Sequence, residues 1–411
     1  MPTAIDRRAF LAGTIAAAVP LGSASAQSAP FKIGLLTVKT GPLAQGGYQM
    51  EQGITVFLKE RNYTLAGRKV ELISADSGGN PAGAKTKAQE LVEREHVDVI
   101  VGPLAAFELL AITDYIAQAK VPIFPDAAAE DVTQRRPNPY LLRTTTTSGQ
   151  IPHVLAHYAA TELKLKRMAT ISEDFAFGHE QCGAFQRVFE DNGGKIVRKL
   201  WPPLVTPDYT PFIAQIGNVD GVFMGFAGSN PVKFLRGYSD LGLKRIPLLA
   251  GWTAMDDALL KSLGDEAIGV YSGSNYSASI DSEPNKRFVA AMLKEADNLP
   301  GGYSSGMYFA GVCIEAALQK TAGKIDDKQA FMDALRAVKL TNTPRGDFHF
   351  DHLGNVVSDI HIRRCERKDG KLVNTVIKTY PQVSQFWTYD EKAFLAQPVY
   401  SRDNPPAKNL E

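Results

Sequence analysis

Residues 97–133 constrain the fold of this chain more than any other stretch. They contain two short apolar runs, 97–101 and 121–124, and each is long enough for a buried strand of a parallel sheet. Gly102-Pro103 ends the first run, and a segment with apolar residues on one helical face follows it. Pro125 ends the second run. Two strand-to-helix connections in succession are typical of an α/β protein with a parallel sheet.

Small, uncharged residues follow both of these predicted strands. In open α/β sheets, ligands bind beyond the carboxyl ends of the strands, where helix N-termini offer free N–H groups. Small side chains at that edge let a ligand approach the backbone. We therefore predict a binding edge at two short segments, Leu104-Ala105-Ala106 and Ala127-Ala128-Ala129.

The alternation of strands and helices begins at residue 31 and restarts after residue 151, so a chain of 411 residues is expected to form two lobes. A short strand at 139–143 and the threonine run 144–147 mark a predicted crossing between them. The other predicted strands are 31–38, 69–75, 167–171, 195–200, 219–224, 246–250, 267–271, 347–350, 356–363 and 371–380. Predicted helices include 154–163, 183–190, 232–241, 254–262, 285–296, 305–321 and 328–338.

The first 26 residues have the pattern of an export signal. Arg7-Arg8 precedes the apolar run 11–21, which is too short to span a membrane, and Ala24-Ser25-Ala26 is a small-residue cleavage site. The alternative is an N-terminal membrane helix. We predict that residues 1–26 are a twin-arginine signal peptide, and that the protein acts in the periplasm without inserting into the membrane.

Charge and cysteine content exclude some classes of function. The formal net charge is +1, which gives no indication of binding to nucleic acid or to an anionic membrane surface. Cys182, Cys313 and Cys365 follow no metal-ligand spacing, and whether two of them pair is left open. The chain has no G-x-G-x-x-G and no Walker motif, so we predict no nucleotide cofactor.

Three patterns that can signal chemistry have simpler explanations. Gly302–Gly306 matches G-x-S-x-G, but a nucleophile elbow needs a preceding strand, and 298–301 has the composition of a turn. His153 and His157 lie four residues apart, a spacing that metals use, without a third ligand nearby in sequence. The pair His349 and His352 is equally incomplete. We predict neither a catalytic site nor a metal site.

Several short motifs occur in the order found in one known family, the leucine/isoleucine/valine-binding type (type I) of periplasmic substrate-binding protein, which serves ABC importers. They are Ile33-Gly34, Thr40-Gly41-Pro42, Asp76 with Asn80-Pro81, Val101-Gly102-Pro103, Pro122–Pro125, Tyr140–Thr144, Phe177-Gly178 and Asp240–Leu243. The chain resembles this family over about residues 31–380. The resemblance implies two Rossmann-like α/β lobes joined by three hinge crossings, which close on a ligand. The expected divisions are 31–146 with 278–345, 147–277 with 346–380, and a tail at 381–411.

The resemblance also implies which residues face the ligand. In the first lobe they are Leu104, Ala105, Ala106, Phe107, Ala127, Ala128 and Ala129, and in the second Phe177, Phe226, Ala227, Gly251, Trp252 and Thr253. In family members that bind amino acids, first-lobe hydroxyl groups hold the α-carboxylate and the ammonium group. A second-lobe carboxylate also meets the ammonium group.

This chain departs from that pattern. Alanines stand at the hydroxyl positions and Trp252 stands at the acidic one, although Asp256 lies just beyond. A desolvated ammonium group without a partner would be strongly unfavourable. Gly46-Gly47 replaces a bulky residue and is expected to make room. We therefore expect a small aromatic or apolar carboxylate, held by N–H groups after Ala106 and by aromatic rings.

Some alternatives stay open. Phe177 and Phe226 are equally compatible with the hydrophobic core. A branched-chain or other amino acid remains an alternative ligand, with Asp256 meeting its ammonium group. A ligand-sensing regulator of the same fold is a second alternative, and an exported enzyme is disfavoured because no catalytic constellation is present. The main hypothesis is a monomeric solute receptor whose partner is an ABC permease.

Overall fold

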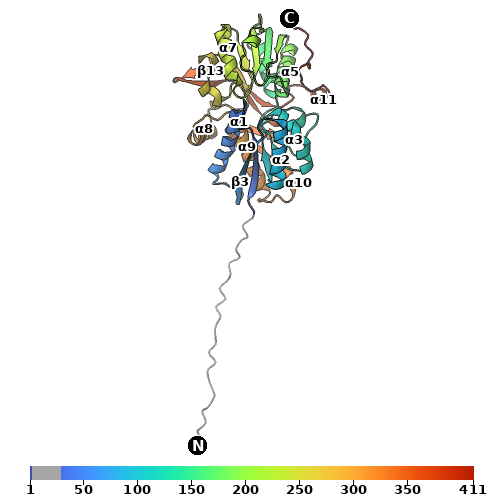
Figure 1. Cartoon of the computed structure of the whole chain (residues 1–411), viewed down its shortest axis with the longest axis vertical. Helices are drawn as coiled ribbons and strands as arrows, with labels where there is room; N and C mark the ends of the chain where they lie inside the picture. Colours follow the sequence, from blue (N-terminus) through green and yellow to red (C-terminus); the bar gives the residue numbers. More distant parts are fainter. Residues whose placement is uncertain (2–28) are drawn as a thin grey trace.

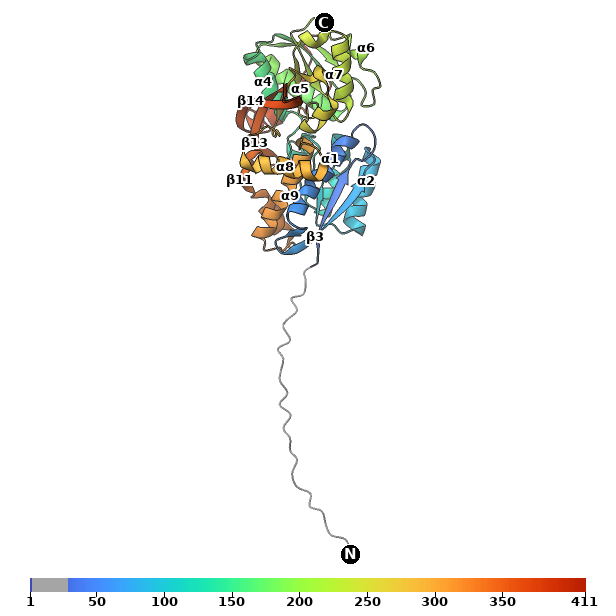
Figure 2. The same cartoon turned by 90° about the vertical axis from the view of Figure 1, so that its left-hand side faces the viewer.

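The computed structural model describes Met1 and residues 29–411, so all of the predicted signal peptide except Met1 lies outside the described residues. Figure 1 shows two lobes, one containing the blue, cyan and orange segments and the other the green and yellow segments. Figure 2 shows the same division from the side. Each lobe has its own β-sheet with a core of parallel strands. The predicted α/β architecture is confirmed.

The first lobe contains a five-stranded sheet of order β2-β3-β1-β4-β5. Its strands are β1 Phe31–Thr37, β2 Thr64–Leu65, β3 Arg68–Asp76, β4 Val99–Val101 and β5 Ile123–Phe124. Its helices are α1 Ala44–Glu60, α2 Pro81–Gln89 continued by a π-helical turn Glu90–Arg94, α3 Ala106–Ala119, α8 Glu283–Ala296, α9 Gly302–Lys320 and α10 Lys328–Arg336. Helix α9 packs along α1, so this late segment completes the first lobe.

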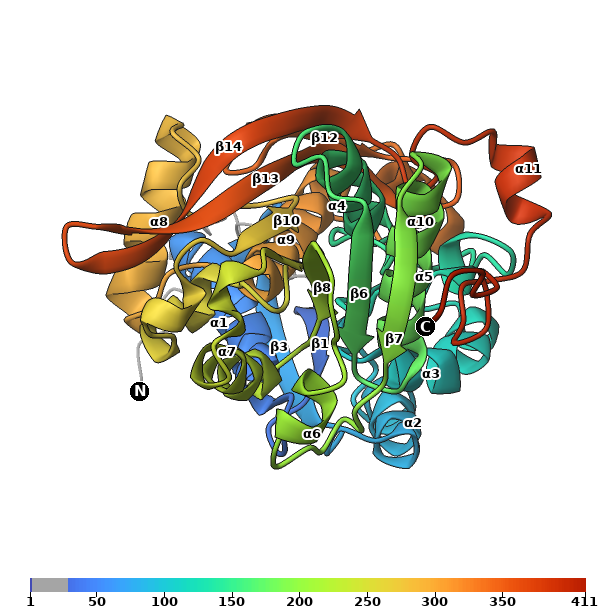
Figure 3. The same cartoon turned by 90° about the horizontal axis from the view of Figure 1, so that it is seen from above.

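The second lobe contains a larger sheet, of order β11-β12-β13-β10-β9-β8-β6-β7, with β14 beside β13. Its strands are β6 Arg167–Ser172, β7 Lys195–Leu200, β8 Gly221–Gly225, β9 Leu248–Ala250, β10 Tyr271–Ser274, β11 Lys339–Thr343, β12 Gly346–Phe350, β13 Val356–Lys368 and β14 Lys371–Val383. Strands β6 to β10 are parallel, and β13 runs antiparallel to β10. Figure 3 shows β6, β7 and β8 side by side beneath the long β13–β14 hairpin.

Four helices and a long tail cover the second sheet. The helices are α4 Gln150–Thr161, α5 Ala176–Asp191, α6 Thr210–Ile213 and α7 Asn230–Asp240. The tail forms α11 Glu391–Leu395 and then places Tyr400 against α4, where its hydroxyl lies 2.9 Å from His153 Nε2. None of the helices in the part of the chain that the structure describes is long and apolar enough to cross a membrane.

Three sequence predictions of local structure are wrong. Residues 139–143 form two isolated bridges, Leu141 to Ile123 and Arg143 to Asn355, because the chain is passing from one sheet to the other. The predicted helix 254–262 is a 3₁₀ helix, Asp257–Ser262, whose start is held by the buried pair between Asp257 and Arg363 at 2.8 Å. The predicted strand 267–271 begins only at Tyr271 because a 3₁₀ turn precedes it.

Within residues 29–411 the chain passes between the lobes three times. The first passage joins β5 to α4, the second joins β10 to α8, and the third joins α10 to β13. Phe350 of β12 packs against Phe124 of the first lobe at 6.5 Å between ring centroids, while the far half of β13 pairs with β10. The third passage therefore extends along the β11–β13 segment, and the residue boundaries of the lobes stay predictions.

Candidate ligand-binding site

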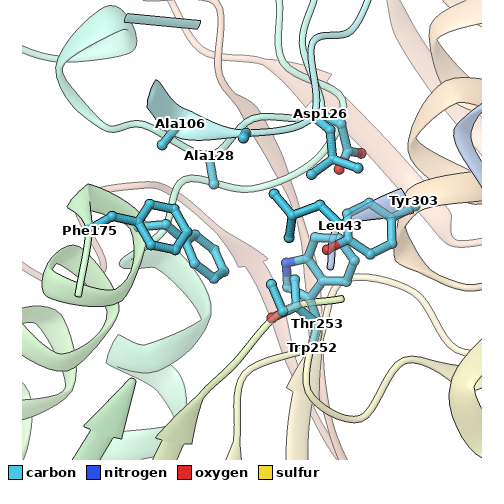
Figure 4. Close-up of a pocket in the computed structure, with 12 residues that line it drawn as sticks. Leu43, Ala106, Asp126, Ala128, Phe175, Trp252, Thr253 and Tyr303 are labelled. Carbon is cyan, nitrogen blue, oxygen red and sulfur yellow. The ribbon is translucent and has the colours of Figure 1, made fainter. Parts of the chain in front are cut away.

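A pocket lies between the lobes, beyond the carboxyl ends of the parallel strands. Figure 4 shows small side chains above it and aromatic rings on both sides. The first lobe contributes Leu43, Leu104, Ala105, Ala106, Asp126, Ala128 and Tyr303, and the second contributes Phe175, Phe177, Ala227, Trp252 and Thr253.

The start of helix α3 forms part of the first-lobe wall. Gly102 allows the chain to turn there: its φ is +99°, and a Cβ atom would lie 1.9 Å from the carbonyl oxygen of Leu36. Buried Glu108 accepts the N–H of Ala105 at 3.0 Å and the hydroxyl of Ser77. The next N–H group, on Ala106, occupies the first helical position, where no carbonyl of its own helix can accept it. This helix end favours a bound anion.

The alanine loop after β5 is held from behind by one cation. Arg143 is fully buried, and it donates to the carbonyl oxygens of Ala127 at 3.1 Å and Ala129 at 2.6 Å. Its third contact is the hydroxyl of Thr133 at 2.8 Å. These bonds fix the loop so that the methyl group of Ala128 faces the cavity.

Asp126, like Leu43 and Tyr303, is a residue of the first-lobe lining that sequence reasoning missed. It directly follows β5, and its backbone N–H donates to the carbonyl oxygen of Pro103 at 3.0 Å. The side chain is buried, and neither carboxyl oxygen has a hydrogen-bond partner among the described residues. Burial and the nearby Asp256 raise the pKa of Asp126 well above its usual range, against a smaller effect of Arg143.

Asp256 does not line the cavity. Its carboxyl oxygens accept the N–H groups of Gly302 at 2.6 Å and Ala258 at 2.9 Å, so it caps a 3₁₀ helix and ties the second lobe to α9. Burial raises the pKa of Asp256 to about 7. In the sequence analysis, Asp256 was the alternative partner for a ligand ammonium group. Its carboxyl group is instead hydrogen-bonded to backbone N–H groups.

Aromatic rings form the second-lobe wall. Phe175 and Phe177, at the start of α5, stack with centroids 5.9 Å apart. Trp252, after β9, meets Tyr303 of α9 edge-on at 4.7 Å. Figure 4 places Phe175 on one side of the cavity and Trp252 with Tyr303 on the other, with the indole nitrogen facing the space between them. Thr253 donates its hydroxyl to the carbonyl of Phe226 at 2.7 Å.

The structure brings together most, but not all, of the predicted site residues. Those that line the cavity are Leu104, Ala105, Ala106, Ala128, Phe177, Ala227, Trp252 and Thr253. Phe107 does not line it and packs edge-on against Phe175 at 5.6 Å. Ala127 faces away and serves Arg143 through its carbonyl. Phe226 is fully buried in the second-lobe core between Tyr209 and Phe234, with centroid distances of 5.1 and 4.9 Å.

The room expected at Gly46-Gly47 is already filled. A Cβ atom on Gly46 would lie 2.8 Å from Leu104 and 3.0 Å from the ring of Tyr303. The glycine therefore admits Tyr303, and Tyr303 then faces the cavity. Tyr303 belongs to the G-x-S-x-G match, in which Ser304 caps its helix by accepting the N–H of Gly301 at 2.9 Å. Among the described residues, no group of three or more His, Cys, Asp and Glu side chains is placed to hold a metal.

The two lobes touch across the cleft. The N–H of Ser229 donates to the carbonyl of Pro42 at 3.2 Å, and Gly302 donates to Asp256 as described. The Phe107–Phe175 ring pair also joins the lobes. The lobes are therefore in contact beside the cavity, as expected for the closed form of a hinged protein.

The chain was compared with protein families and with known proteins to identify its family. A family model described as a periplasmic binding protein matches residues 30–371. The Leu/Ile/Val-binding protein homolog 6 of Brucella suis biovar 1 (strain 1330) is 29% identical over 383 residues, which cover 90% of this chain and 96% of that protein.

Two solved structures of ABC transporter binding proteins are similar to this chain over most of its length. An ABC transporter substrate-binding protein from Sphaerobacter thermophilus is 33% identical, with a TM-score of 0.81 over 87% of this chain and 99% of that one. A solute-binding protein of an ABC transporter from Rhodopseudomonas palustris BisB5, solved with 3,4-dihydroxybenzoic acid, is 33% identical, with a TM-score of 0.83 over 87% and 98%. The resemblance predicted from the motifs is confirmed, and the chain belongs to the periplasmic binding protein family.

Proposed function

We propose that this protein captures a small aromatic carboxylate between its lobes in the periplasm and delivers it to the permease of an ABC importer. The observation that carries the proposal is the division of the cavity. Backbone N–H groups and alanines line one wall, and Phe175, Phe177 and Trp252 line the other. Such a site suits a planar ring that carries an anionic group.

The carboxylate of the ligand would bind at the start of α3. The N–H of Ala106 is free of intrahelical acceptors, and the helix end carries partial positive charge. Ala106 and Ala128 have no side chain beyond the methyl group, so a carboxylate can approach the backbone closely. No positively charged side chain lines the cavity within the described residues, so the helix end carries this role.

An α-amino acid fits this cavity less well. Its ammonium and carboxylate groups are attached to one carbon atom and must find partners close together. Asp126, the free carboxyl group of the lining, lies on the Tyr303 side, whereas Ala106 lies on the Phe175 side. The polar groups of the cavity therefore suit a longer ligand with an apolar body between two polar ends.

The similarity to a solute-binding protein solved with 3,4-dihydroxybenzoic acid supports the same ligand class. The twin-arginine pattern of residues 1–26 supports delivery to the periplasm, and the closed lobes provide a form that a permease can recognise. We propose a monomeric binding protein that does not alter its ligand. Mass spectrometry of the ligand recovered after prolonged incubation should show it unchanged.

A thermal-shift panel on the chain from Gln27 onward tests the proposal. The panel contains benzoates, cinnamates, leucine, valine and aliphatic diacids. A ligand at 100 times its dissociation constant adds about 2.7 kcal/mol of stability, which gives a clear shift in the unfolding midpoint. We expect shifts with aromatic acids and none with the amino acids. Shifts with leucine or valine alone would overturn the proposal.

A branched-chain amino acid is the second candidate, because the curated relative is a Leu/Ile/Val-binding homolog. In that case the ammonium group would have to reach Asp126. Removing the charge with Asp126→Asn would then abolish leucine binding. Under the main proposal, the same variant keeps its affinity for unsubstituted benzoate.

A further inference from the structure

Asp126 is the only acidic residue in the lining of the cavity within the described chain. It is 2% exposed, and both of its carboxyl oxygens lack a hydrogen-bond partner there. A buried polar group without a partner costs free energy, and such groups are rare in folded proteins. The other buried acids around the cleft, Asp256 and Glu108, have backbone or hydroxyl donors. Asp126 differs from these two acids because its carboxyl group has no hydrogen-bond donor among the described residues.

The surroundings of Asp126 do not supply the missing donor. Gly306 lies close to it: a Cβ atom on this glycine would be 2.9 Å from Oδ1 and 2.6 Å from Thr145 Cγ2, so this position has no room for a side chain that could donate. The nearby hydroxyl of Tyr303 forms no hydrogen bond with either carboxyl oxygen of Asp126. Arg143 donates instead to the loop carbonyls and to Thr133. Within the described residues, the carboxyl group of Asp126 therefore stays available to a donor on a ligand.

We propose that Asp126 accepts a hydrogen bond from a hydroxyl group on the ring of the ligand, at the end away from the ligand carboxylate. The site would then select hydroxylated aromatic acids over unsubstituted ones. This inference rests on the proposed function, because the ligand carboxylate is taken to bind at Ala106. Figure 4 shows Ala106 and Asp126 on different sides of the cavity, with the aromatic rings below and between them.

A hydroxyl group matches this position better than an ammonium group does. An ammonium group has three N–H donors to satisfy, whereas a hydroxyl group has one. Asp126 provides one carboxyl group, and the remaining lining toward Tyr303 includes the apolar side chains Leu43 and Leu104. Burial keeps the pKa of Asp126 high, so the empty site avoids an uncompensated charge.

Selectivity follows from the cost of leaving Asp126 unpaired. Sites built to bond a ligand hydroxyl reject the analogue that lacks it, because a buried group then stays without a partner. We expect 4-hydroxybenzoate or 3-hydroxybenzoate to bind the wild-type protein at least about tenfold more tightly than benzoate.

Isothermal titration calorimetry at one pH tests this on the chain from Gln27 onward. Asp126→Leu replaces the carboxyl group with an apolar group of similar size. We expect the preference for the hydroxylated acid to fall to about one in this variant, while benzoate binding stays within about threefold of wild type. Asp126→Ala serves as a second variant should the leucine not be accommodated. Asp126→Asn keeps an acceptor oxygen and should retain part of the preference.

Asp98→Asn is the matched control. Asp98 is a partly buried acid at the amino end of β4, where it accepts the N–H of Lys32 at 2.8 Å, so this variant should keep the full preference. If benzoate and the hydroxybenzoates bind the wild-type protein equally, or if Asp126→Leu and Asp126→Ala keep the preference, the inference is wrong and the proposed function stands. If no aromatic acid binds, both are wrong.

Discussion

The part of the first-lobe wall formed by the start of α3 and the loop after β5 consists mainly of backbone and small side chains, whereas the second-lobe wall is built mainly from aromatic rings. The first wall is held from behind by polar groups, with Arg143 bonded to the alanine loop and Glu108 to the start of α3. The second wall is held by ring packing, as in the stacked pair Phe175 and Phe177. One wall therefore offers directed hydrogen bonds, and the other offers contact area.

This difference suggests an order of binding. Hydrogen bonds depend on direction and distance, so a ligand would orient on the first lobe while the cleft is open. The aromatic wall would then add contact area as the hinge closes. We expect changes to the first wall to alter which ligands bind, and changes to the second wall to lower affinity for all of them.

The largest effect is expected from Ala106→Pro. Proline is tolerated at the first position of a helix, and Ala105 before it has the extended backbone that proline requires, with φ −97° and ψ 147°. The change removes the N–H proposed to meet the ligand carboxylate and places a ring carbon there. We expect affinity for benzoates to fall about 100-fold, or about 2.7 kcal/mol, by calorimetry.

The matched control is Lys328→Pro. Lys328 is exposed and occupies the first position of α10, after the N-cap Asp327, far from the cavity lining. Affinity should be unchanged in this variant. Equal affinities of Ala106→Pro and wild type would show that the helix start does not bind the carboxylate.

A smaller effect is expected from Trp252→Ala on the second wall. The indole ring is buried against Tyr303 and faces the cavity, so its loss removes apolar contact with the ligand. We expect a loss of about 2 kcal/mol, roughly 30-fold, similar for every aromatic acid. Trp387→Ala, which removes an indole packed on His157 and Tyr380 outside the cavity, should leave the affinity unchanged. A loss that depends strongly on ring substituents would contradict the division of roles between the walls.

The sequence predicts the two lobes well because they depend on local patterns, and the binding edge stays a prediction. The apolar runs at β4 and β5, ended by Gly102-Pro103 and Pro125, are sufficient to place the alanine segments at the carboxyl ends of parallel strands. Strand β12 was predicted at 347–350, whereas β11 needed long-range information. It pairs antiparallel with β12, which pairs antiparallel with β13, and Phe348 and Phe350 of β12 pack on the first lobe.

The site was predicted less completely than the fold, for a physical reason. Phe177 and Phe226 both follow strands of the second lobe, and only the three-dimensional packing shows that one ring faces the cavity and the other enters the core. Asp126 precedes the predicted alanines directly, but whether its carboxyl group finds a partner depends on residues far away in sequence. Tyr303 comes from α9 and reaches the cavity because Gly46 has no side chain.

The smallest predicted effect concerns the support of the second wall. Glu173 accepts the N–H of Ala227 and the amide of Asn230, both at 3.0 Å, and burial raises its pKa to about 7. In the unfolded chain a glutamate loses its proton near pH 4.3, roughly the ordinary value. Between these values the folded protein binds the additional proton, so its stability falls as the pH rises, by roughly 4 kcal/mol in total.

Glu173→Gln tests this contribution, because an amide keeps an acceptor oxygen for Ala227 and cannot titrate. The thermal unfolding midpoint of the ligand-free variant should fall less between pH 5 and pH 8 than that of the wild type, although Glu180 and Asp256, with pKa values also raised by burial to about 7, keep part of the slope. Glu162→Gln is the control: the side chain of Lys378 lowers the pKa of this exposed acid, so it is ionised in both states across that range. Parallel curves for wild type and Glu173→Gln would show that Glu173 makes no contribution to the pH dependence of stability.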